Sequence, residues 1–236
     1  MDLRDKYGVN KNLYKEVICP VCGQVTLDSF WICENCFWEC DDPSIPENEE
    51  SPPNHCSVLQ YKARAGRKLA FLLRHSTDPQ FITLNGGWAS VEEITKKMFI
   101  GKIFLEQIVG NDKKQRFAFD ETKTKIRANQ GHSIKGVIIE PIKATPPDIL
   151  YYGTATRFLE KIMQEGLKPM GRNFVHLSAD IETAKKVGSR HGESVVLIVD
   201  AKRFYEDTNK LFLSPNGIWQ AEFIESKYIL RKDFNE

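Results

Sequence analysis

The sequence lacks both a long hydrophobic run and a strong net charge. In its 236 residues no stretch of about 18 apolar side chains occurs, and the first residues, Met-Asp-Leu-Arg-Asp-Lys, lack a signal peptide's apolar core. These absences argue against a membrane or secreted protein, so we expect an intracellular, cytoplasmic one. With 41% hydrophobic and 28% charged residues, the composition excludes disorder throughout and allows one large or two small domains.

Two nucleotide-binding signatures are also missing. No glycine fingerprint of the Rossmann kind and no Walker loop occurs in the chain. The last third instead mixes strands with helices, which predicts an α+β fold rather than a doubly wound α/β domain. Strands are expected at 148–154, 174–178, 194–199 and around the hairpin signal Asn216-Gly217, and helices at 157–165 and 180–187.

Cysteine is absent after position 56, and its concentration before that point indicates a metal site. Cys19-Pro-Val-Cys22-Gly and Cys33-Glu-Asn-Cys36 form two CxxC pairs separated by ten residues. Four thiolates so spaced can hold a tetrahedral Zn²⁺, and such a short segment has little other means of stabilising a fold. Disulfides are the alternative, but an intracellular protein rarely keeps them. We expect a zinc ribbon-like head over 1–42 with a structural Zn²⁺. Cys40 and Cys56 are more simply read as small thiols, although Cys40 could replace a ligand and a contribution from Cys56 stays open. His55 lies in the linker and could approach the head.

Charge is distributed unevenly around a proline-rich, acidic linker expected at 43–60. Residues 1–56 hold four basic and eleven acidic side chains, whereas residues 57–145 hold 16 basic and 8 acidic ones. A basic middle indicates a polyanionic partner, and the modest excess favours local phosphate contacts over extended duplex binding.

The basic middle predicts three short helices. The first runs from Arg64 and ends with Arg74-His75, where cations complement the helix dipole. The second follows a capping box formed by Ser90 and Glu93. The third is expected over 101–110, with Gly110 in the C′ position and with inward side chains at Ile103, Phe104, Ile108 and Val109.

A β-hairpin is expected next, from Arg116 to Ser133. Phe117, Phe119 and Ile126 recur at the period of a strand, which predicts one hidden face and one face of cations and amides. On its own this segment could be an ordinary charged surface hairpin. Three helices and a hairpin follow the order of a winged-helix domain, so a winged-helix-like RNA-binding lobe is expected over 61–143.

Several motifs resemble known families. The head is similar to bacterial CPCC-type cysteine-rich domains, although Val21 stands where that family has another cysteine. From about residue 60 to 230 the chain resembles the KptA-type RNA 2′-phosphotransferases. The motifs that carry this second resemblance, in chain order, are Leu-Leu-Arg-His at 72–75, Asn-Gly-Gly-Trp at 85–88, Asn-Asp-Lys-Lys-Gln-Arg-Phe at 111–117, Ile-Arg-Ala-Asn-Gln-Gly-His-Ser-Ile at 126–134, Tyr-Gly-Thr at 152–154, Met-Gly-Arg-Asn-Phe-Val-His-Leu-Ser at 170–178 and Ser-Pro-Asn-Gly-Ile-Trp at 214–219.

The KptA resemblance implies an NAD-binding lobe with an ADP-ribosyltransferase-like fold over 146–236. It implies cofactor contacts from Tyr152, Gly153, Thr154, His176, Ser178, Asn216 and Ile218. Two positions depart from the family, which usually has His where Tyr152 and Phe174 stand. Tyr keeps a hydroxyl donor, whereas Phe cannot form a hydrogen bond through its side chain.

The same resemblance implies the reaction and its catalytic residues. An internal RNA 2′-phosphate attacks the nicotinamide ribose of NAD⁺, and the ADP-ribosylated RNA then yields a 2′-OH and ADP-ribose 1″,2″-cyclic phosphate, as in tRNA splicing or RNA repair. The family's catalytic set falls on Arg74, His75, Arg116 and Arg172, of which Arg74 and Arg116 would hold the 2′-phosphate. Weaker candidates for RNA or phosphate contacts are Arg127, Asn129, Gln130, His132 and Ser133.

Two other functions fit the same residues. An ADP-ribosyltransferase of the same fold would stop after the first step and cap phosphorylated nucleic-acid ends. A non-catalytic zinc-containing RNA-binding adaptor would have lost its NAD site, and the changes at Tyr152 and Phe174 favour this third function.

Overall fold

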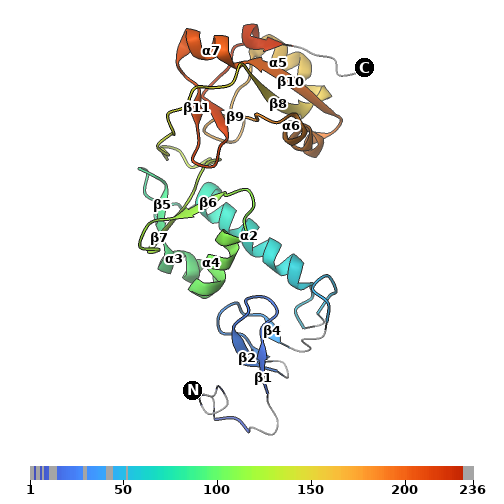
Figure 1. Cartoon of the computed structure of the whole chain (residues 1–236), viewed down its shortest axis with the longest axis vertical. Coiled ribbons are helices and arrows are strands. Elements are labelled where there is room, and N and C mark those ends of the chain that lie inside the picture. The colour runs from blue at the N-terminus through green and yellow to red at the C-terminus, as the bar shows by residue number, and fades with distance from the viewer. Residues whose placement is uncertain are drawn as a thin grey trace. The chain divides into compact units, whose positions relative to one another are not determined.

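The computed structural model divides the chain into two compact units (Figure 1). One contains Met1–Thr83 and Trp88–Ala128, and the other contains Leu84–Gly87 and Asn129–Glu236. The structure describes residues 3, 6, 8–10, 15–28, 31–40, 45–51 and 53–230. Of the expected linker, residues 43, 44 and 52 lie outside these described residues.

The cysteine-rich head of the first unit consists of two small antiparallel hairpins. β1 (Glu16–Ile18) pairs with β2 (Val25–Leu27), and β3 (Trp31–Ile32) pairs with β4 (Glu39–Cys40). Each CxxC pair lies in the turn of one hairpin. The N–H of Gly23 donates to the carbonyl of Cys19 at 2.8 Å, and Phe37 donates to Cys33 in the same way at 2.8 Å.

Three helices follow in the same unit: α2 (Val58–His75), α3 (Val91–Met98) and α4 (Lys102–Gly110). α2 begins before the expected Arg64, because Ser57 and Gln60 form a capping box that the sequence analysis missed. The capping box predicted at Ser90 is wrong: α3 does start there, but Ser90 makes no side-chain capping hydrogen bond.

The details predicted for α4 need two corrections. Gly110 is the last helical residue and Asn111 is the C-cap, so Gly110 is not in the C′ position. Ile103 is 45% exposed, and Leu105 is buried beside Phe104 instead.

A three-stranded antiparallel sheet completes this unit, in the order β5-β7-β6. Its strands are β5 (Trp88–Ser90), β7 (Lys125–Ala128) and β6 (Phe117–Phe119), with Phe119 opposite Ile126. The core beneath the sheet contains the buried side chains of Leu69, Leu73, Ile94, Phe104, Leu105 and Ile126.

The second unit contains two three-stranded antiparallel sheets. The first has the order β13-β10-β8 and consists of Ile229–Leu230, Ser194–Asp200 and Ile149–Ala155. The second has the order β11-β12-β9 and consists of Phe212–Leu213, Trp219–Ala221 and Val175–Leu177. A core of buried side chains from both sheets includes Leu150, Leu177, Leu197, Trp219 and Tyr228.

The helices of the second unit are α5 (Leu159–Glu165), α6 (Ile181–Gly188) and α7 (Ala201–Thr208), with 3₁₀ turns η1 (Thr156–Phe158), η2 (Ser189–His191) and η3 (Ser226–Tyr228). The predicted strands, α5 and α6 are confirmed within one or two residues, and so is the α+β class. The structure adds α7, which the sequence analysis did not predict.

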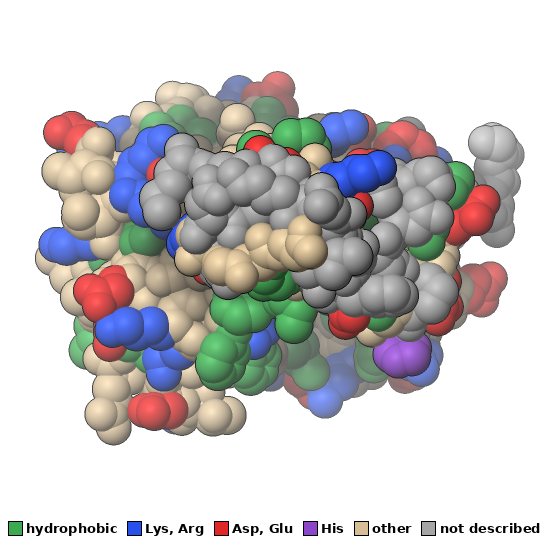
Figure 2. All heavy atoms as spheres, turned by 90° about the horizontal axis from the view of Figure 1, so that it is seen from below, with side chains coloured by type: hydrophobic (Ala, Val, Ile, Leu, Met, Phe, Trp, Pro, Cys, Tyr) green, Lys and Arg blue, Asp and Glu red, His purple; other side chains and the backbone are tan. Residues whose placement is uncertain are grey.

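The surface carries charges of both signs and some exposed apolar side chains. Ile18, Val25 and Ile32 of the head are each more than half exposed. Figure 2 shows hydrophobic side chains gathered beside charged ones on the face seen from below. Among the described residues, no helix combines the length and the apolar character that crossing a membrane requires.

Candidate active site and metal centre

The end of α2 positions Arg74 and His75. Leu69 and Leu73 are fully buried, so the last turns of the helix are anchored in the core of the first unit. Arg74 is itself buried, with 7% of its surface exposed. Its guanidinium carbon lies 6.0 Å from the centre of the Phe117 ring. The packing of α2 therefore fixes where this cation can act.

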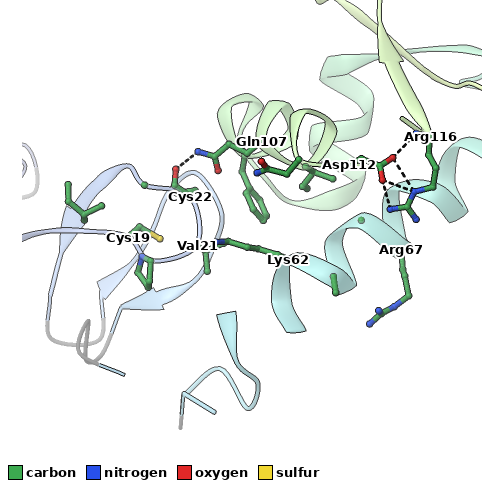
Figure 3. Close-up of a pocket in the computed structure, with 16 residues that line it drawn as sticks. Cys19, Val21, Cys22, Lys62, Arg67, Gln107, Asp112 and Arg116 are labelled. Carbon is green, nitrogen blue, oxygen red and sulfur yellow. Dashed lines mark hydrogen bonds and ion pairs between the residues drawn. The ribbon is translucent and has the colours of Figure 1, made fainter. Parts of the chain in front are cut away.

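Asp112 holds Arg116 in place (Figure 3). Its carboxylate accepts the backbone N–H of Arg116 at 2.6 Å and the side-chain Nε at 3.0 Å, and it lies 2.9 Å from Nη2. Burial alone would raise the pKa of Asp112, but the hydrogen bonds from Arg116 outweigh it and hold that pKa below its ordinary value. The Arg116 side chain remains 33% exposed, so it is oriented and still accessible.

Arg74 and Arg116 share one aromatic ring. Phe117 is the buried first residue of β6, and its ring centre lies 5.4 Å from the guanidinium carbon of Arg116. Such cation–π contacts favour a fixed orientation of each guanidinium, by about 0.5–1 kcal/mol at an exposed site. Two like charges held at one ring repel each other, and a bound anion would relieve this repulsion. A phosphate dianion, which can accept hydrogen bonds from two guanidinium groups, fits the arrangement.

Arg127 is ordered by a second aromatic ring in this unit. It lies on β7 opposite Trp88 of β5, and its guanidinium carbon is 4.6 Å from the centre of the Trp88 ring. The indole face therefore supports a cation on the same sheet that carries Phe117. Neither aromatic platform was predicted, because the pairing of β5 with β7 is not visible in the sequence.

The predicted hairpin ends earlier than expected. β7 stops at Ala128, and the residues from Asn129 onward belong to the second unit. Asn129 and His132 are 6% and 4% exposed, so the prediction that the whole stretch to Ser133 presents one polar hairpin face is wrong. The backbone explains the difference, because Gly131 takes a φ of 87° and the carbonyl of His132 accepts the N–H of Asn173 at 2.9 Å.

This connection places the weaker RNA candidates in two groups. Arg127 belongs to the first unit. The other candidates lie in the second unit, in the segment whose His132 carbonyl accepts the N–H of Asn173; they are Asn129, Gln130, His132 and Ser133. Asn173 also donates through Nδ2 to the carbonyl of Ile134 at 3.0 Å. The buried Asn129 and His132 are therefore close in the fold to the loop that carries Arg172.

Tyr152, Arg172 and His176 form an electropositive cluster in the second unit. Nη1 of Arg172 lies 3.4 Å from Nδ1 of His176, and Nε2 of His176 lies 2.9 Å from the side-chain amide of Gln220. The guanidinium of Arg172 and the amide nitrogen of Gln220 both only donate, so the neutral imidazole of His176 can accept a hydrogen bond from one of them, and its tautomer decides which. Gln220 was not predicted from the sequence, because only the pairing of β9 with β12 places it opposite His176.

The ionisation of this cluster suits anion binding. Partial burial, followed by the positive charge of Arg190, lowers the pKa of Arg172, while Tyr152 raises it. Guanidinium nevertheless stays charged at neutral pH. Burial raises the pKa of Tyr152, so its hydroxyl remains a hydrogen-bond donor. The cluster thus offers a cation, an imidazole and a phenol.

Several other cofactor candidates have structural functions of their own. A Cβ on Gly153 would collide with the backbone carbonyl of Ala184, so this glycine lets α6 approach β8. Ser178 donates through Oγ to a backbone carbonyl at the start of α6, at 2.8 Å. The N–H of Ile218 donates to Ser214 Oγ at 2.9 Å within the β11–β12 loop. Thr154 is buried on β8, and Asn216 lies in that loop.

The four cysteines of the two CxxC pairs converge in the head. Their sulfur atoms lie within 4.8 Å of one another and all four residues are buried. Cys19 Sγ is 3.4 Å from Cys36 Sγ, and Cys22 Sγ is 3.6 Å from Cys33 Sγ. Tetrahedral Zn–S bonds of roughly 2.3 Å would separate the sulfurs by about 3.8 Å. The donor set therefore fits Zn²⁺.

The protonation of these thiols also favours a cation. The hydrogen bond with Cys19 lowers the pKa of Cys22, and hydrogen bonds with Cys19 raise the pKa values of Cys33 and Cys36. The hydrogen bond with Cys22 raises the pKa of Cys19 to about 11. Thiolates this close repel one another, and a bound Zn²⁺ would stabilise all of them together. Among the described residues, the cluster does not include Cys40, Cys56 or His55.

Comparison with known proteins shows the family. The family model described as RNA 2'-phosphotransferase, Tpt1 / KptA family, matches residues 60–222. The chain belongs to this family. The match spans Arg74, His75, Arg116 and Arg172, whereas the cysteine cluster lies before it.

Similar proteins support the same relationship. A Fusobacterium nucleatum protein named "Probable RNA 2'-phosphotransferase" is 43% identical over 173 residues, which cover 70% of this chain and 96% of that protein. A Flavobacterium johnsoniae protein of the same name is 43% identical over 167 residues, or 68% of this chain and 91% of its own length. One from Trichormus variabilis is 42% identical over 163 residues, or 66% and 89%. The Tpt1/KptA relatives are thus matched over nearly their whole length.

Proposed function

We propose that this chain removes an internal 2′-phosphate from RNA, with NAD as its co-substrate. Family membership supports the reaction, and the observation that carries the assignment of the site is the pair Arg74 and Arg116 at the ring of Phe117. A phosphate monoester needs concentrated positive charge with fixed geometry, and this pair provides both.

The first unit provides the phosphate-binding residues. Arg74 and Arg116 bind the 2′-phosphate, and His75, adjacent to Arg74 at the end of α2, donates a hydrogen bond or a proton near neutral pH. Arg127, stacked on Trp88, binds a neighbouring backbone phosphate. We assign to the helices and the β5-β7-β6 sheet the role of a winged-helix-like RNA lobe.

The second unit serves as an ADP-ribosyltransferase-like NAD lobe in this proposal. NAD supplies the ribose carbon to which the phosphate is transferred. Arg172 neutralises phosphate or diphosphate charge, while Tyr152 and His176 offer hydrogen bonds. The tyrosine hydroxyl replaces the donor that the family's usual histidine provides, and Phe174 contributes no side-chain hydrogen bond. The other residues assigned to NAD are Gly153, Thr154, Ser178, Asn216 and Ile218. Asn129, Gln130, His132 and Ser133 are assigned to RNA or phosphate.

We assign a structural Zn²⁺ to Cys19, Cys22, Cys33 and Cys36. All four positions are filled by thiolates, so no coordination site is left open for catalysis. The ion would stabilise the head, whose described residues include few other buried side chains.

One incubation tests the proposed function. The protein is mixed with NAD⁺ and an oligoribonucleotide that carries a single internal 2′-phosphate, and the RNA is analysed by mass spectrometry. We expect RNA with a free 2′-OH together with free nicotinamide. A lasting ADP-ribose adduct would instead identify an ADP-ribosyltransferase that stops after the first step. No nicotinamide release with phosphorylated RNA would identify a binding protein.

A further inference from the structure

A groove in the first unit extends from the cysteine-rich head to Arg116. Its volume is about 700 Å³, within the range of sites that hold a small ligand such as one nucleotide. The first CxxC turn forms one wall, α2 and α4 form the others, and Arg116 lies at one end (Figure 3). The head residues in this wall lie before the family match, so the groove is an addition to the matched region.

Specific contacts fix the cysteine-rich head against α2 and α4. Gln107 of α4 donates through Nε2 to the carbonyl of Cys22 at 2.5 Å, and the hydroxyl of Tyr61 on α2 donates to the carbonyl of Cys36 at 2.6 Å. The Tyr61 ring also meets Trp38 edge-on, with the ring centres 5.4 Å apart. Both CxxC turns are therefore bonded to the helical part, and the groove wall has a defined position.

The charge of the groove suits a polyanion. Lys62, Arg67 and Arg116 line it, and the one carboxylate among its described lining residues, that of Asp112, is already bonded to Arg116. Lys62 forms an ion pair with Glu47, with 3.4 Å between Nζ and Oε1. The wall formed by the first CxxC turn carries no charged side chain. The head as a whole is acidic, but none of its described acidic residues lies in this wall. Positive charge is thus concentrated on the side of α2 and at the end near Arg116.

The floor of the groove is open at a glycine. Gly66 is a buried residue in the middle of α2, and a Cβ built on it would meet nothing within 4 Å. Glycine in a helix interior is less favourable than alanine by about 0.8–1.0 kcal/mol. Packing within the chain does not require this glycine. The space that a side chain would occupy there is part of the groove.

We propose that this groove binds the RNA nucleotide next to the 2′-phosphate, so that the cysteine-rich head extends the substrate-binding surface. The inference rests on the proposed function, because Arg116 links the groove to the phosphate. Arg67 and Lys62 bind the phosphodiester backbone. The exposed Ile18 and the half-buried Pro20 form the apolar wall, which packs against the base or sugar without selecting a sequence.

Binding without turnover tests the inference. The full chain is loaded with Zn²⁺, and its affinity for a fluorescent 2′-phosphorylated oligoribonucleotide is measured by anisotropy without NAD, over a series of salt concentrations. Arg67→Gln removes a groove cation, and Gly66→Leu fills the floor. Arg64→Gln, an exposed arginine of α2 outside the groove, is the matched control. Circular dichroism and zinc content confirm that each variant is folded.

We expect Arg67→Gln and Gly66→Leu to weaken binding about fivefold or more at low salt, and Arg67→Gln to reduce the slope of log K against log salt by about one. Arg64→Gln should change neither. A 4-thiouridine next to the 2′-phosphate should cross-link to residues 18–23. Wild-type affinity in both groove variants and no cross-link in this segment would overturn the inference. If phosphate removal were still observed, the proposed function would survive that result. A groove cross-link without phosphate removal would support the inference and refute the function.

Discussion

Arg74 and Arg116 lie against the same ring, that of Phe117, although one ends a helix and the other precedes a strand. Asp112 fixes the second guanidinium from behind. The first unit therefore holds two cations in a defined arrangement before any ligand binds, which lowers the entropy cost of binding a phosphate.

Replacing Arg116 tests the phosphate site. Arg116→Ala should abolish measurable phosphate removal, a loss in kcat/KM of about 10²–10³ or more, because it removes a charged donor from the group that reacts. Lys113→Ala removes a neighbouring exposed cation and should have little effect. Steady-state kinetics with the phosphorylated oligonucleotide measure both variants. Wild-type turnover in Arg116→Ala would refute the assignment, and an unchanged circular dichroism spectrum controls for folding.

Asp112 should contribute to stability only at pH values where its carboxyl group is ionised. Its folded-state pKa lies below the ordinary 3.8, so its contribution is complete above that value and disappears as pH falls through the lower folded pKa. Asp112→Asn should lower the free energy of unfolding at pH 7 by about 1–2 kcal/mol, with the lower end favoured because Arg116 is partly exposed. Urea unfolding from pH 7 to pH 3 should show a constant difference above about pH 4 that shrinks below it. Glu121→Gln is the exposed control, and a difference that grows toward pH 3 would contradict this account.

Metal content separates the ligand cysteines from the others. Cys36→Ser should lose the ion and lower the thermal midpoint, because the metal would no longer hold the CxxC turn whose Cys36 carbonyl accepts the Tyr61 hydroxyl. Burial, followed by nearby thiols, raises the pKa of Tyr61 to about 12, so the phenol remains a donor at neutral pH. Cys40→Ser changes a buried thiol outside the cluster and should retain one Zn²⁺ per chain by elemental analysis. Loss of zinc from both variants would reject the four-ligand assignment.

Gln220 should act as a positioning residue for His176. His176→Ala is expected to raise the KM for NAD about tenfold, since it removes a hydrogen-bonding ring from the proposed NAD lobe. Gln220→Ala should raise the same KM less and leave kcat within about twofold, because the ring remains but loses its 2.9 Å partner. RNA affinity measured without NAD should be unchanged in both. A fall in kcat with a constant KM would assign His176 to the chemical step instead.

The sequence predicted the elements that obey local rules. Arg74 and His75 do end a helix, and Asn216-Gly217 does lie in a hairpin, because polar caps and turn residues act over a few positions. α7 escaped prediction because its eight residues are mostly polar and only Ala201 and Phe204 are buried, so few apolar side chains mark the segment as a helix.

Contacts between distant segments could not be predicted. The stacking of Arg127 on Trp88 and the pairing of His176 with Gln220 depend on strand pairing, and the shared ring of Phe117 depends on the approach of α2 to β6. The division of the predicted hairpin has the same cause. His132 looked like a surface residue in the sequence, and its burial follows from the backbone bond to Asn173 in a segment far along the chain.

The most direct test of the central claim is the ratio of two products in one reaction. Nicotinamide and 2′-dephosphorylated RNA are quantified together by liquid chromatography, with NAD⁺ and the phosphorylated oligonucleotide each omitted in turn. The proposed function predicts one nicotinamide released for each phosphate removed, and neither product when either substrate is missing. Dephosphorylation without NAD⁺, or intact phosphorylated RNA after prolonged incubation with both, would contradict it.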